Sequence, residues 1–243
     1  MRNAGRSTDV LFGSSSMIWD ALAYNGAGHG PAAAGKPAPL IAASPTGGTQ
    51  DGRERILDVA EMLFRRFGHV KTTMANIAWE LGVSRTTLYR FFPTKEAIEE
   101  QVCARIAART LAQFRGVIVD GDRASDQLSQ ALRELGRQTS SRMTAEPHLH
   151  RLLVAAFRNQ WGVANQYIRT VNGVLDRIVQ NGLATGEFAL GDAMELRRFI
   201  AASMLVFIHP GLSELMRFDD EGLSTDLDAH VRAIVRSIKQ GAQ

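Results

Sequence analysis

Two short helical patterns separated by a glycine constrain the fold of this chain more than any other feature. Thr73 can cap the first pattern, in which apolar residues recur at the three- and four-residue spacing of an α-helix. Gly82 ends that pattern, Ser84 can cap the next one, and Pro93 stops it. Two short helices joined by a turn of about three residues that contains glycine are typical of a helix-turn-helix unit.

The small residues of this segment distinguish a helix-turn-helix from an arbitrary bundle. Two helices that cross steeply at short range need a side chain no larger than a methyl group where they touch, and Ala78 supplies it. Gly82, four residues later, tolerates the positive φ of a sharp turn. The apolar spacing alone would fit any three-helix bundle. An arbitrary bundle would not, however, be expected to have small, turn, capping and apolar residues in this order, at Ala78, Gly82, Ser84 and Leu88. We therefore expect a helix-turn-helix at about 73–92, inside a three-helix domain over 51–97.

Basic residues outnumber acidic ones in and around this unit. Between residues 65 and 95 there is a single acid, Glu80. The same stretch holds six basic residues, which are Arg65, Arg66, Lys71, Arg85, Arg90 and Lys95. A solvated helix face usually mixes both signs, so this local excess favours binding to the phosphates of duplex DNA. The whole chain carries a formal charge of only +3, so the placement of the charges matters more than their total.

Residues 72–97, TTMANIAWELGVSRTTLYRFFPTKEA, resemble the DNA-binding domain of TetR/AcrR-family transcriptional regulators. The resemblance rests on paired threonines followed by Ile-Ala, Gly-Val-Ser, Thr-Leu-Tyr, Phe-Pro and Lys-Glu-Ala. It implies an all-helical homodimer, usually a repressor that a small ligand releases from its operator. The family usually has Tyr or His at the position of Phe91, where the side chain commonly reaches a phosphate. Because phenylalanine cannot make that hydrogen bond, either other contacts supply the affinity or the ring faces inward.

The second helix of such a pair places its first residues in the major groove. This geometry nominates Arg85 and Thr86 for base edges, and Arg85 can make a bidentate contact to guanine. Thr87 and Tyr89 can contact a base, a methyl group or the backbone, and the resemblance favours phosphate for Tyr89. The full set expected to bind DNA is Thr72, Thr73, Ser84, Arg85, Thr86, Thr87, Tyr89, Arg90 and Lys95.

Residues at helix starts are expected to hold the phosphate backbone. Thr73 opens the second helix, and Lys95 follows the expected cap Thr94, where a cation opposes the helix dipole unless an anion binds there. Arg90 fits either a phosphate contact or a solvated position. Trp79 lies beside apolar neighbours, so packing is favoured over a functional role.

Residues 1–50 differ in composition from the rest of the chain. They contain eight glycines and four prolines without apolar periodicity, and such a segment cannot offset the entropy lost on folding. We expect a disordered leader here, and Met17 offers an alternative start. The glycines of 25–30 have no strand before them and no amphipathic helix after them, so a phosphate-binding loop is not favoured.

Only helical periodicity runs from residue 98 to the C-terminus, so we expect an all-α fold. By the resemblance, 98–243 is a helical ligand-sensing and dimerisation domain. Its helices are expected near 95–119, 124–143, 147–159, 162–183, 192–208 and 225–239. The segment 192–208 is apolar on opposite sides and should be buried on both. With the last helix it is the expected dimer interface, through Ala201, Ala202, Leu205, Ile208, Val231, Ile234, Val235 and Ile238. The alternative is that both helices are core of a monomer.

An apolar effector pocket with a few polar groups is expected within the same domain. Its candidate lining residues are Leu111, Phe114, Leu132, Met143, Phe157, Trp161 and Tyr167. For each of these residues an ordinary core position is the alternative. No cofactor is expected.

Other features exclude several classes of protein. No stretch approaches the eighteen or so apolar residues of a membrane span, and the N-terminus is a poor signal peptide, so we expect a cytoplasmic protein, nucleoid-associated when bound to DNA. Cys103 is the only cysteine, which excludes an internal disulfide, and a buried structural thiol is favoured over an oxidant sensor. His148 and His150 are two residues apart and point to different sides of a helix, so no metal site is expected.

Three functions remain to be distinguished. The leading hypothesis is a homodimeric repressor that binds a double-stranded DNA operator and is released by a small-molecule effector. The rival within DNA binding is a regulator controlled by a protein partner, or one without a ligand. An enzyme with an appended helix-turn-helix is not favoured, because residues 98–243 contain no nucleophile–base pair, metal spacing or cofactor fingerprint.

Overall fold

The computed structural model describes residues 49–189, 192–215 and 220–239, with side chains described at 50–189, 192–214 and 225–239. All regular structure within these ranges is helical, which confirms the all-α fold. The helices are α2 (Thr49–Phe67), α3 (Met74–Glu80), α4 (Arg85–Phe91), α5 (Lys95–Gly116), α6 (Ala124–Ala145), α7 (Pro147–Arg158), α8 (Gly162–Ala184), α9 (Ala193–Ile208), α10 (Pro210–Leu215) and α11 (Asp220–Lys239).

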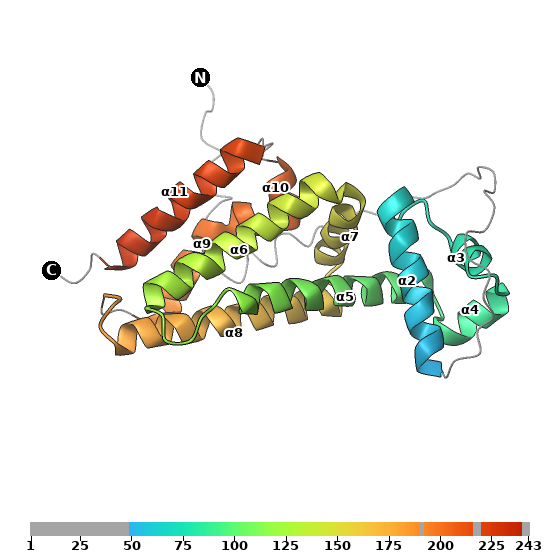
Figure 1. The fold of residues 1–243 in the computed structure, drawn as a ribbon, viewed down its shortest axis with the longest axis horizontal. Coiled ribbons are helices and arrows are strands. Elements are labelled where there is room, and N and C mark those ends of the chain that lie inside the picture. Colours follow the sequence, from blue (N-terminus) through green and yellow to red (C-terminus); the bar gives the residue numbers. More distant parts are fainter. Residues whose placement is uncertain (1–48, 190–191, 216–219, 240–243) are drawn as a thin grey trace, which may run out of the picture.

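Figure 1 shows an elongated molecule in which α2, α3 and α4 gather at one end and the other helices form the body. From the three-helix end α5 runs along the body beside α8, and α6 contacts both of them. α9 and α11 pack against α6. α7 contacts α2, α5 and α6, so α5 and α7 join the two ends of the molecule.

Side-chain caps set the starts of the short helices. Thr73, Ser84 and Thr94 each accept a hydrogen bond from the backbone N–H three residues later, at 3.2, 3.0 and 3.1 Å. These contacts satisfy N–H groups that the first helical turn leaves without a partner. Gly82 has φ of +67°, a left-handed conformation that a residue with a Cβ adopts only with strain. The three expected caps and the glycine turn are confirmed.

The first hydrophobic core extends beyond residue 97, the expected domain boundary. Its centre is formed by Phe64, Ile77 and Leu88 from α2, α3 and α4, none of which has exposed surface. The same cluster takes in residues of α5 and α7, among them Ile98, Val102, Leu149 and Leu152. The three-helix unit therefore packs directly on α5 and α7, and a close-packed core transmits a shift of either helix to it.

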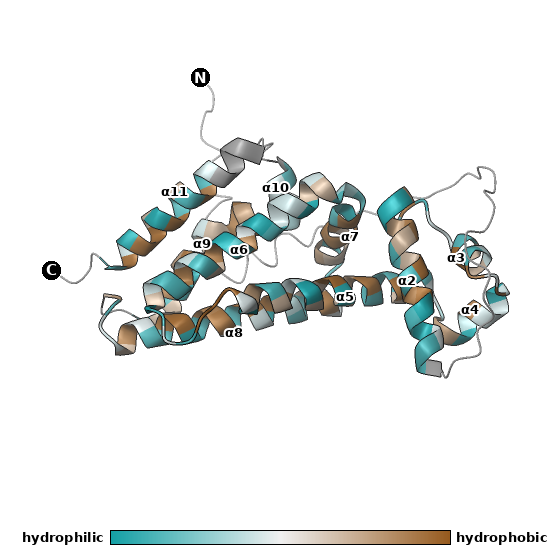
Figure 2. Ribbon diagram, viewed as in Figure 1, coloured by the Kyte–Doolittle hydropathy of each residue, from teal (hydrophilic) through white to brown (hydrophobic). Residues whose placement is uncertain are grey.

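A second core fills the body between α6, α8, α9 and α11. Leu128, Leu132, Leu175 and Val231 are buried within it, together with Phe114 from the end of α5. Hydrophobic and hydrophilic residues alternate along these helices, as Figure 2 shows. In the part of the chain that the structure describes, no helix is long and apolar enough to span a membrane.

The observed helices differ from the expected ones at several ends and in one additional helix; α5, for example, ends at Gly116 rather than near 119. α2 begins at Thr49, two residues before the expected start, whereas the rest of the expected leader lies outside the described residues. α11 begins at Asp220 rather than near 225. α10 was not expected, because its six residues are too few to show a helical period. Pro210 starts it with a φ already suited to the first helical turn.

Candidate DNA-binding and effector sites

The outer face of α4 carries four exposed side chains without a partner among the described residues. α4 turns Leu88 into the core, which leaves Arg85, Thr86, Tyr89 and Arg90 on the surface. None of these four side chains makes a hydrogen bond or ion pair with any residue whose side chain the structure describes. Tyr89 is 49% exposed, which is unusual for an aromatic side chain on a core-forming helix. The face is free to make polar contacts to another molecule.

The exposed charge of residues 65–95 is more one-sided than the sequence suggests. Glu80, the only acid between residues 65 and 95, is just 5% exposed, and its Oε1 has no hydrogen-bond partner among the described residues. Two of the six cations in this stretch, Arg65 and Lys95, are engaged in ion pairs. The four cations without an ion pair to a described residue are Arg66, Lys71, Arg85 and Arg90. Over residues 65–95 the exposed charge is therefore positive, as phosphate binding requires, while α2 also carries the exposed acids Asp51, Glu54 and Asp58.

Lys95 forms an ion pair within the chain that the sequence did not reveal. Its Nζ lies 3.1 Å from Oε1 of Glu99, one turn later, and Nδ1 of His69 lies 3.0 Å from the same oxygen. Burial raises the pKa of Glu99, but the hydrogen bond from His69 and the charge of Lys95 outweigh it and leave that pKa below its ordinary value. A phosphate contact by Lys95, which remains a prediction, would compete with this ion pair.

The threonines and serines of the expected site do not share one role. Thr72 is 3% exposed and its hydroxyl donates to the carbonyl oxygen of Gly68 at 2.9 Å, so its assignment to the DNA-binding set is corrected to a structural role. The hydroxyls of Thr73, Ser84 and Thr87 take part in the caps of α3 and α4. DNA contacts by these three remain predictions.

Phe91 turns its ring inward, onto α2. A Cβ placed on Gly52 would lie 2.9 Å from Cζ of Phe91, so a larger residue at position 52 would push the ring away. Arg53 supports the same junction, because its Nη1 donates to the carbonyl oxygen of Phe91 at 2.7 Å and its guanidinium carbon lies 4.3 Å from the ring centre of Phe92. Gly52 and Arg53 hold the end of α4, and neither had a signal in the periodicity.

Ion pairs join α2 to the body of the molecule. They connect Arg105 with Glu54 and Asp58, Arg109 with Glu61, and Arg65 with Glu146. The first two arginines belong to α5, and Glu146 lies between α6 and α7. These contacts span the junction that the hydrophobic core also spans, so the position of α2 follows that of α5 and α7.

Two hollows lie where α5, α6, α7, α8 and α9 meet. Each has a volume of about 40 Å³. Phe157, Tyr167 and Ile208 line both of them, and Leu132 lines the second. Of the expected pocket residues, four line neither hollow, namely Leu111, Phe114, Met143 and Trp161. Phe114 is fully buried core, and Leu111 and Trp161 pack against the two cores, so these three fit the alternative of an ordinary core position.

Part of the expected dimer interface is core of the single chain. Val231, Ile234 and Ile238 are 0–3% exposed because α11 turns its apolar stripe onto α6 and α9, and Val235 packs against the same core. Two further members of the expected set, Ala201 and Ile208, line the hollows. In the single chain the segment 192–208 is buried on one side only, and burial of its other side by a second chain remains a prediction. Met194 and Phe199, which were not in the expected set, are exposed on α9 with Ala202, while Leu205 is half-buried.

The single cysteine and the two neighbouring histidines have structural surroundings. Cys103 is buried, and burial together with the charges of Glu99 and Glu100 raises the pKa of its thiol. Nε2 of His150 lies 3.1 Å from the carbonyl oxygen of Pro210, and His148 lies against Gly68, so the two histidines face different surroundings. Within the described ranges no group of three or more acidic, histidine or cysteine side chains is placed to bind a metal ion.

Two family models match the chain. Residues 56–102 match the model described as "Bacterial regulatory proteins, tetR family", and residues 124–235 match the model described as "Tetracyclin repressor-like, C-terminal domain". Nucleoid occlusion factor SlmA of Haemophilus influenzae is 29% identical over 174 residues, which cover 70% of this chain and 76% of that protein.

Solved structures share the fold. A transcriptional regulator from Cytophaga hutchinsonii has a TM-score of 0.59 at 21% identity, covering 77% of this chain and 98% of that one. The FadR regulator of Bacillus subtilis, solved with stearoyl-CoA, has a TM-score of 0.54 at 17% identity, covering 78% and 99%. The chain belongs to the TetR family and is a DNA-binding transcriptional regulator, not an enzyme.

Proposed function

We propose that the protein is a homodimeric repressor that binds an operator through α4 and is released from it by a small molecule. The observation that carries the proposal is the outer face of α4, where Arg85, Thr86, Tyr89 and Arg90 are exposed and make no hydrogen bond or ion pair with a residue whose side chain the structure describes. The buried position of Glu80 removes the acid that would repel phosphates. A helix with this face presents its first residues to the major groove and its later ones to the sugar-phosphate backbone.

The exposed residues divide into base readers and backbone contacts. Arg85 and Thr86 begin α4, so they read base edges, and an arginine bound to O6 and N7 of guanine gives the strongest discrimination. Tyr89 and Arg90 lie one turn later and contact phosphates. Lys71 and Arg66 add to the positive field without reading sequence.

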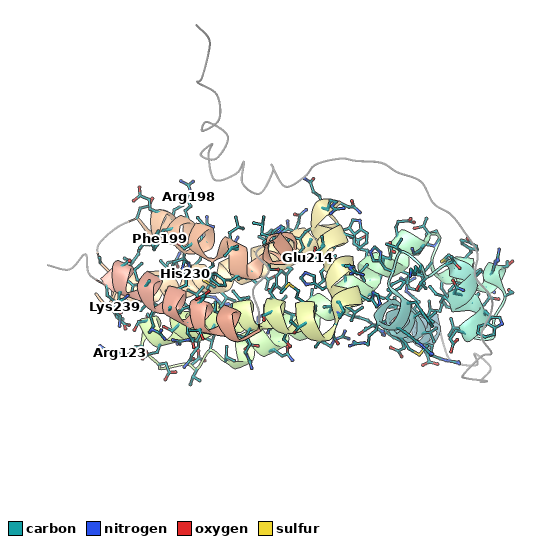
Figure 3. All side chains as sticks on the ribbon, turned by 90° about the horizontal axis from the view of Figure 1, so that it is seen from above. Arg123, Arg198, Phe199, Glu214, His230 and Lys239 are labelled. Carbon is teal, nitrogen blue, oxygen red and sulfur yellow. The ribbon has the colours of Figure 1, made fainter. Side chains whose placement is uncertain are left out.

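The dimer forms through the outer face of α9. Met194 and Phe199 are 49% and 45% exposed, and large apolar side chains in such positions mark interaction surfaces. Figure 3 shows Arg198 and Phe199 in the first half of α9, with Arg198 at the edge of the molecule in that view. Ala202 is on the same face as Phe199, one turn further along, and its small side chain lets a second helix approach closely. A twofold dimer would place two copies of α4 on half-sites about one helical turn of DNA apart.

The hollows supply the effector site. The one lined by Cys103, Ile106 and Ala156 borders the core that holds the three-helix unit, because these residues belong to both. A ligand that enlarged this hollow would displace α5 and α7, and with them α2. FadR of Bacillus subtilis, which shares the fold, was solved with a bound ligand, stearoyl-CoA.

A second candidate function rests on a relative. SlmA of Haemophilus influenzae is named a nucleoid occlusion factor rather than a repressor. A protein of this fold that acts at the nucleoid through a partner protein, without a small ligand, is therefore the alternative. In either case the protein would be found at the nucleoid when bound to DNA.

Selection from a random duplex library, followed by transcription from a promoter that carries the selected site, tests the proposal. We expect a palindromic site bound by two chains, and reduced transcription when the protein is present. A site bound by a single chain, or unchanged transcription, would contradict the homodimeric repressor. Release of the DNA by a small molecule favours the ligand-controlled protein over the partner-controlled one.

A further inference from the structure

One arginine in the hollow between α5, α6, α7 and α8 has no carboxylate partner among the described side chains. Arg142, in the last turn of α6, lines this hollow among mostly apolar side chains. Its Nη2 donates to Oγ1 of Thr110 on α5 at 2.9 Å. It forms no ion pair with any residue whose side chain the structure describes. By contrast, Arg65, Arg105, Arg109, Arg133, Arg137 and Arg197 are all paired with carboxylates.

The groups that surround Arg142 leave its charge uncompensated. Arg109 on α5 is positive, Tyr167 on α8 is a neutral phenol, and His150 on α7 lies 3.4 Å from the carboxylate of Glu214, which forms no ion pair with Arg142. Burial lowers the pKa of Arg142, Tyr167 raises it and Arg109 lowers it further, with a net shift below the ordinary value. Burial also raises the pKa of Tyr167 to about 12, so its hydroxyl keeps its proton and remains a hydrogen-bond donor. A cation removed from water without a counter-charge is costly, and an anion bound beside it would remove that cost.

The arrangement of donors suits a carboxylate. The guanidinium of Arg142 offers a planar pair of N–H groups, which matches the two oxygens of a carboxylate. Tyr167 lines the same hollow, and its hydroxyl makes no hydrogen bond to another described residue, so it can donate to the same anion. Thr110 already bonds Arg142 and holds the guanidinium in place.

The second hollow offers room for an apolar group. It shares Phe157, Tyr167 and Ile208 with the first, and these three side chains separate the two. Its other walls are mainly aliphatic, including Leu135, Val171, Leu175 and Met204. Each hollow alone holds little more than water, so a ligand must join them by moving the separating side chains. The joined space has a charged end at Arg142 and an apolar end towards α9.

We propose that the effector is an amphipathic monocarboxylate, with its carboxylate on Arg142 and Tyr167 and its apolar body in the second hollow. This inference rests on the proposed function in taking the hollows as the effector site. It narrows the effector to molecules with one negative charge and a linear or aryl apolar body. It also assigns Arg142 to ligand binding rather than to the stability of the fold.

A panel of matched ligands tests the charge requirement. The panel contains the straight-chain monocarboxylates from butanoate to dodecanoate, 3-phenylpropanoate and 4-phenylbutanoate, each beside its neutral primary amide. Direct binding to the full-length protein without DNA is measured by calorimetry, and release of a labelled operator by fluorescence anisotropy. We expect at least one carboxylate to bind at least about tenfold more tightly than its amide, the loss expected for a charge-assisted hydrogen bond.

Two variants separate the site from general effects. Arg142→Gln removes the charge and keeps hydrogen-bonding capacity, and it should weaken the carboxylate at least about tenfold while leaving the amide within about twofold. Arg137→Gln on the same helix removes a largely exposed arginine that is paired with Glu134, and should leave both ligands unchanged. The melting temperature without ligand shows that each variant folds, and rescue of carboxylate binding by Arg142→Lys would show that the charge is what matters.

The outcomes distinguish this inference from the proposed function. Equal binding of acids and amides, unchanged carboxylate binding by Arg142→Gln, or no binding by any carboxylate of the panel would overturn the inference. Carboxylate binding that depends on Arg142 but leaves the operator bound would support the anion site and contradict release by ligand. If an amide released the operator, and released it equally well from the Arg142→Gln variant, the proposed function would stand and the inference would be overturned.

Discussion

Two glycines of α8, nine residues apart, should respond in opposite ways to the same substitution. Gly182 is buried, and a Cβ added to it would lie 2.8 Å from Cγ of Phe188 and nearer still to two other ring atoms. Ordinary contacts between carbon atoms are about 3.5–4.0 Å, so the ring would have to move. It cannot withdraw easily, because Phe188 is 2% exposed and its backbone N–H donates to the carbonyl oxygen of Gly182 at 2.9 Å.

The cost of overpacking and the gain in helix propensity together predict whether each substitution stabilises or destabilises the fold. Overpacking of a buried site costs about 1–3 kcal/mol, whereas alanine is about 1 kcal/mol more favourable than glycine within a helix. Gly182→Ala should therefore lower the free energy of unfolding by about 1 kcal/mol, and by up to ~2 kcal/mol if the ring cannot relax. Gly173 is exposed and a Cβ there would meet nothing within 4 Å, so Gly173→Ala should raise the same free energy by about 0.5–1 kcal/mol.

Thermal unfolding of the two variants, followed by circular dichroism, measures this difference. A change of 1 kcal/mol shifts the melting temperature of a chain of this size by about 2–4 °C, so the two variants should move to opposite sides of the wild type. A Gly182→Ala variant at least as stable as Gly173→Ala would refute the packing described for α8 and Phe188.

Three further predictions concern single side chains. Thr72→Val should cost about 0.5–1.5 kcal/mol of unfolding free energy, because it removes the bond to Gly68, and should leave operator affinity unchanged; a loss of affinity without a loss of stability would restore Thr72 to the DNA-binding set. Because the pKa of Glu99 is lower in the folded protein than its ordinary value of 4.5, this carboxylate stabilises the fold above that pH, and the stabilisation is lost as the pH falls through the folded pKa. Denaturant titrations from pH 7 to pH 3 should therefore show that the free energy of unfolding falls more steeply with acid for the wild type than for Glu99→Gln. Parallel curves for the two proteins would contradict the stabilising role of this carboxylate. Phe199→Glu should place charges at the twofold contact, so that light scattering reports a monomer and operator affinity falls. A variant that stays dimeric would show that this face of α9 is not the interface.

Much of the fold follows from local rules that the sequence displays. The periodicity predicted α5 to α9 to within a few residues, because each helix is long enough to show an apolar stripe. The caps Thr73, Ser84 and Thr94 were predictable because the capping contact joins residues only three apart. Of the two alternatives for Phe91, the inward-facing ring is the one observed.

The errors arise where contacts between distant residues decide the outcome. Thr72 and Thr73 are adjacent and chemically alike, yet the chain turns one into the core and leaves the other exposed. An apolar stripe shows that a helix buries one face, but not whether α6 or a second chain covers it, and so Val231 was assigned to the wrong contact. The pocket residues were equally ambiguous, since core and cavity walls have the same composition.

Arg142 shows what the sequence could not reveal about a site. An arginine in the last turn of a helix normally complements the helix dipole and lies in solvent. Only the packing of α5, α6 and α8 shows that this one lines a hollow beside Thr110 and Tyr167, without a carboxylate partner among the described residues. The proposed ligand contact follows from the absence of a described carboxylate partner, and no local sequence pattern shows that absence.

The central claim, that the outer face of α4 reads DNA sequence, is tested most directly by the base preference of Arg85→Ala. Operator affinity is measured at fixed salt for the selected site and for every single-base change in one half-site, with Arg115→Ala as the control. Arg115 is also exposed, and it lies in the last turn of α5, the helix whose first turn is next to α4. We expect Arg85→Ala to lose about 1–3 kcal/mol of binding free energy and its discrimination at one base pair, and Arg115→Ala to match the wild type. An Arg85→Ala variant with unchanged preference at every position would contradict the account.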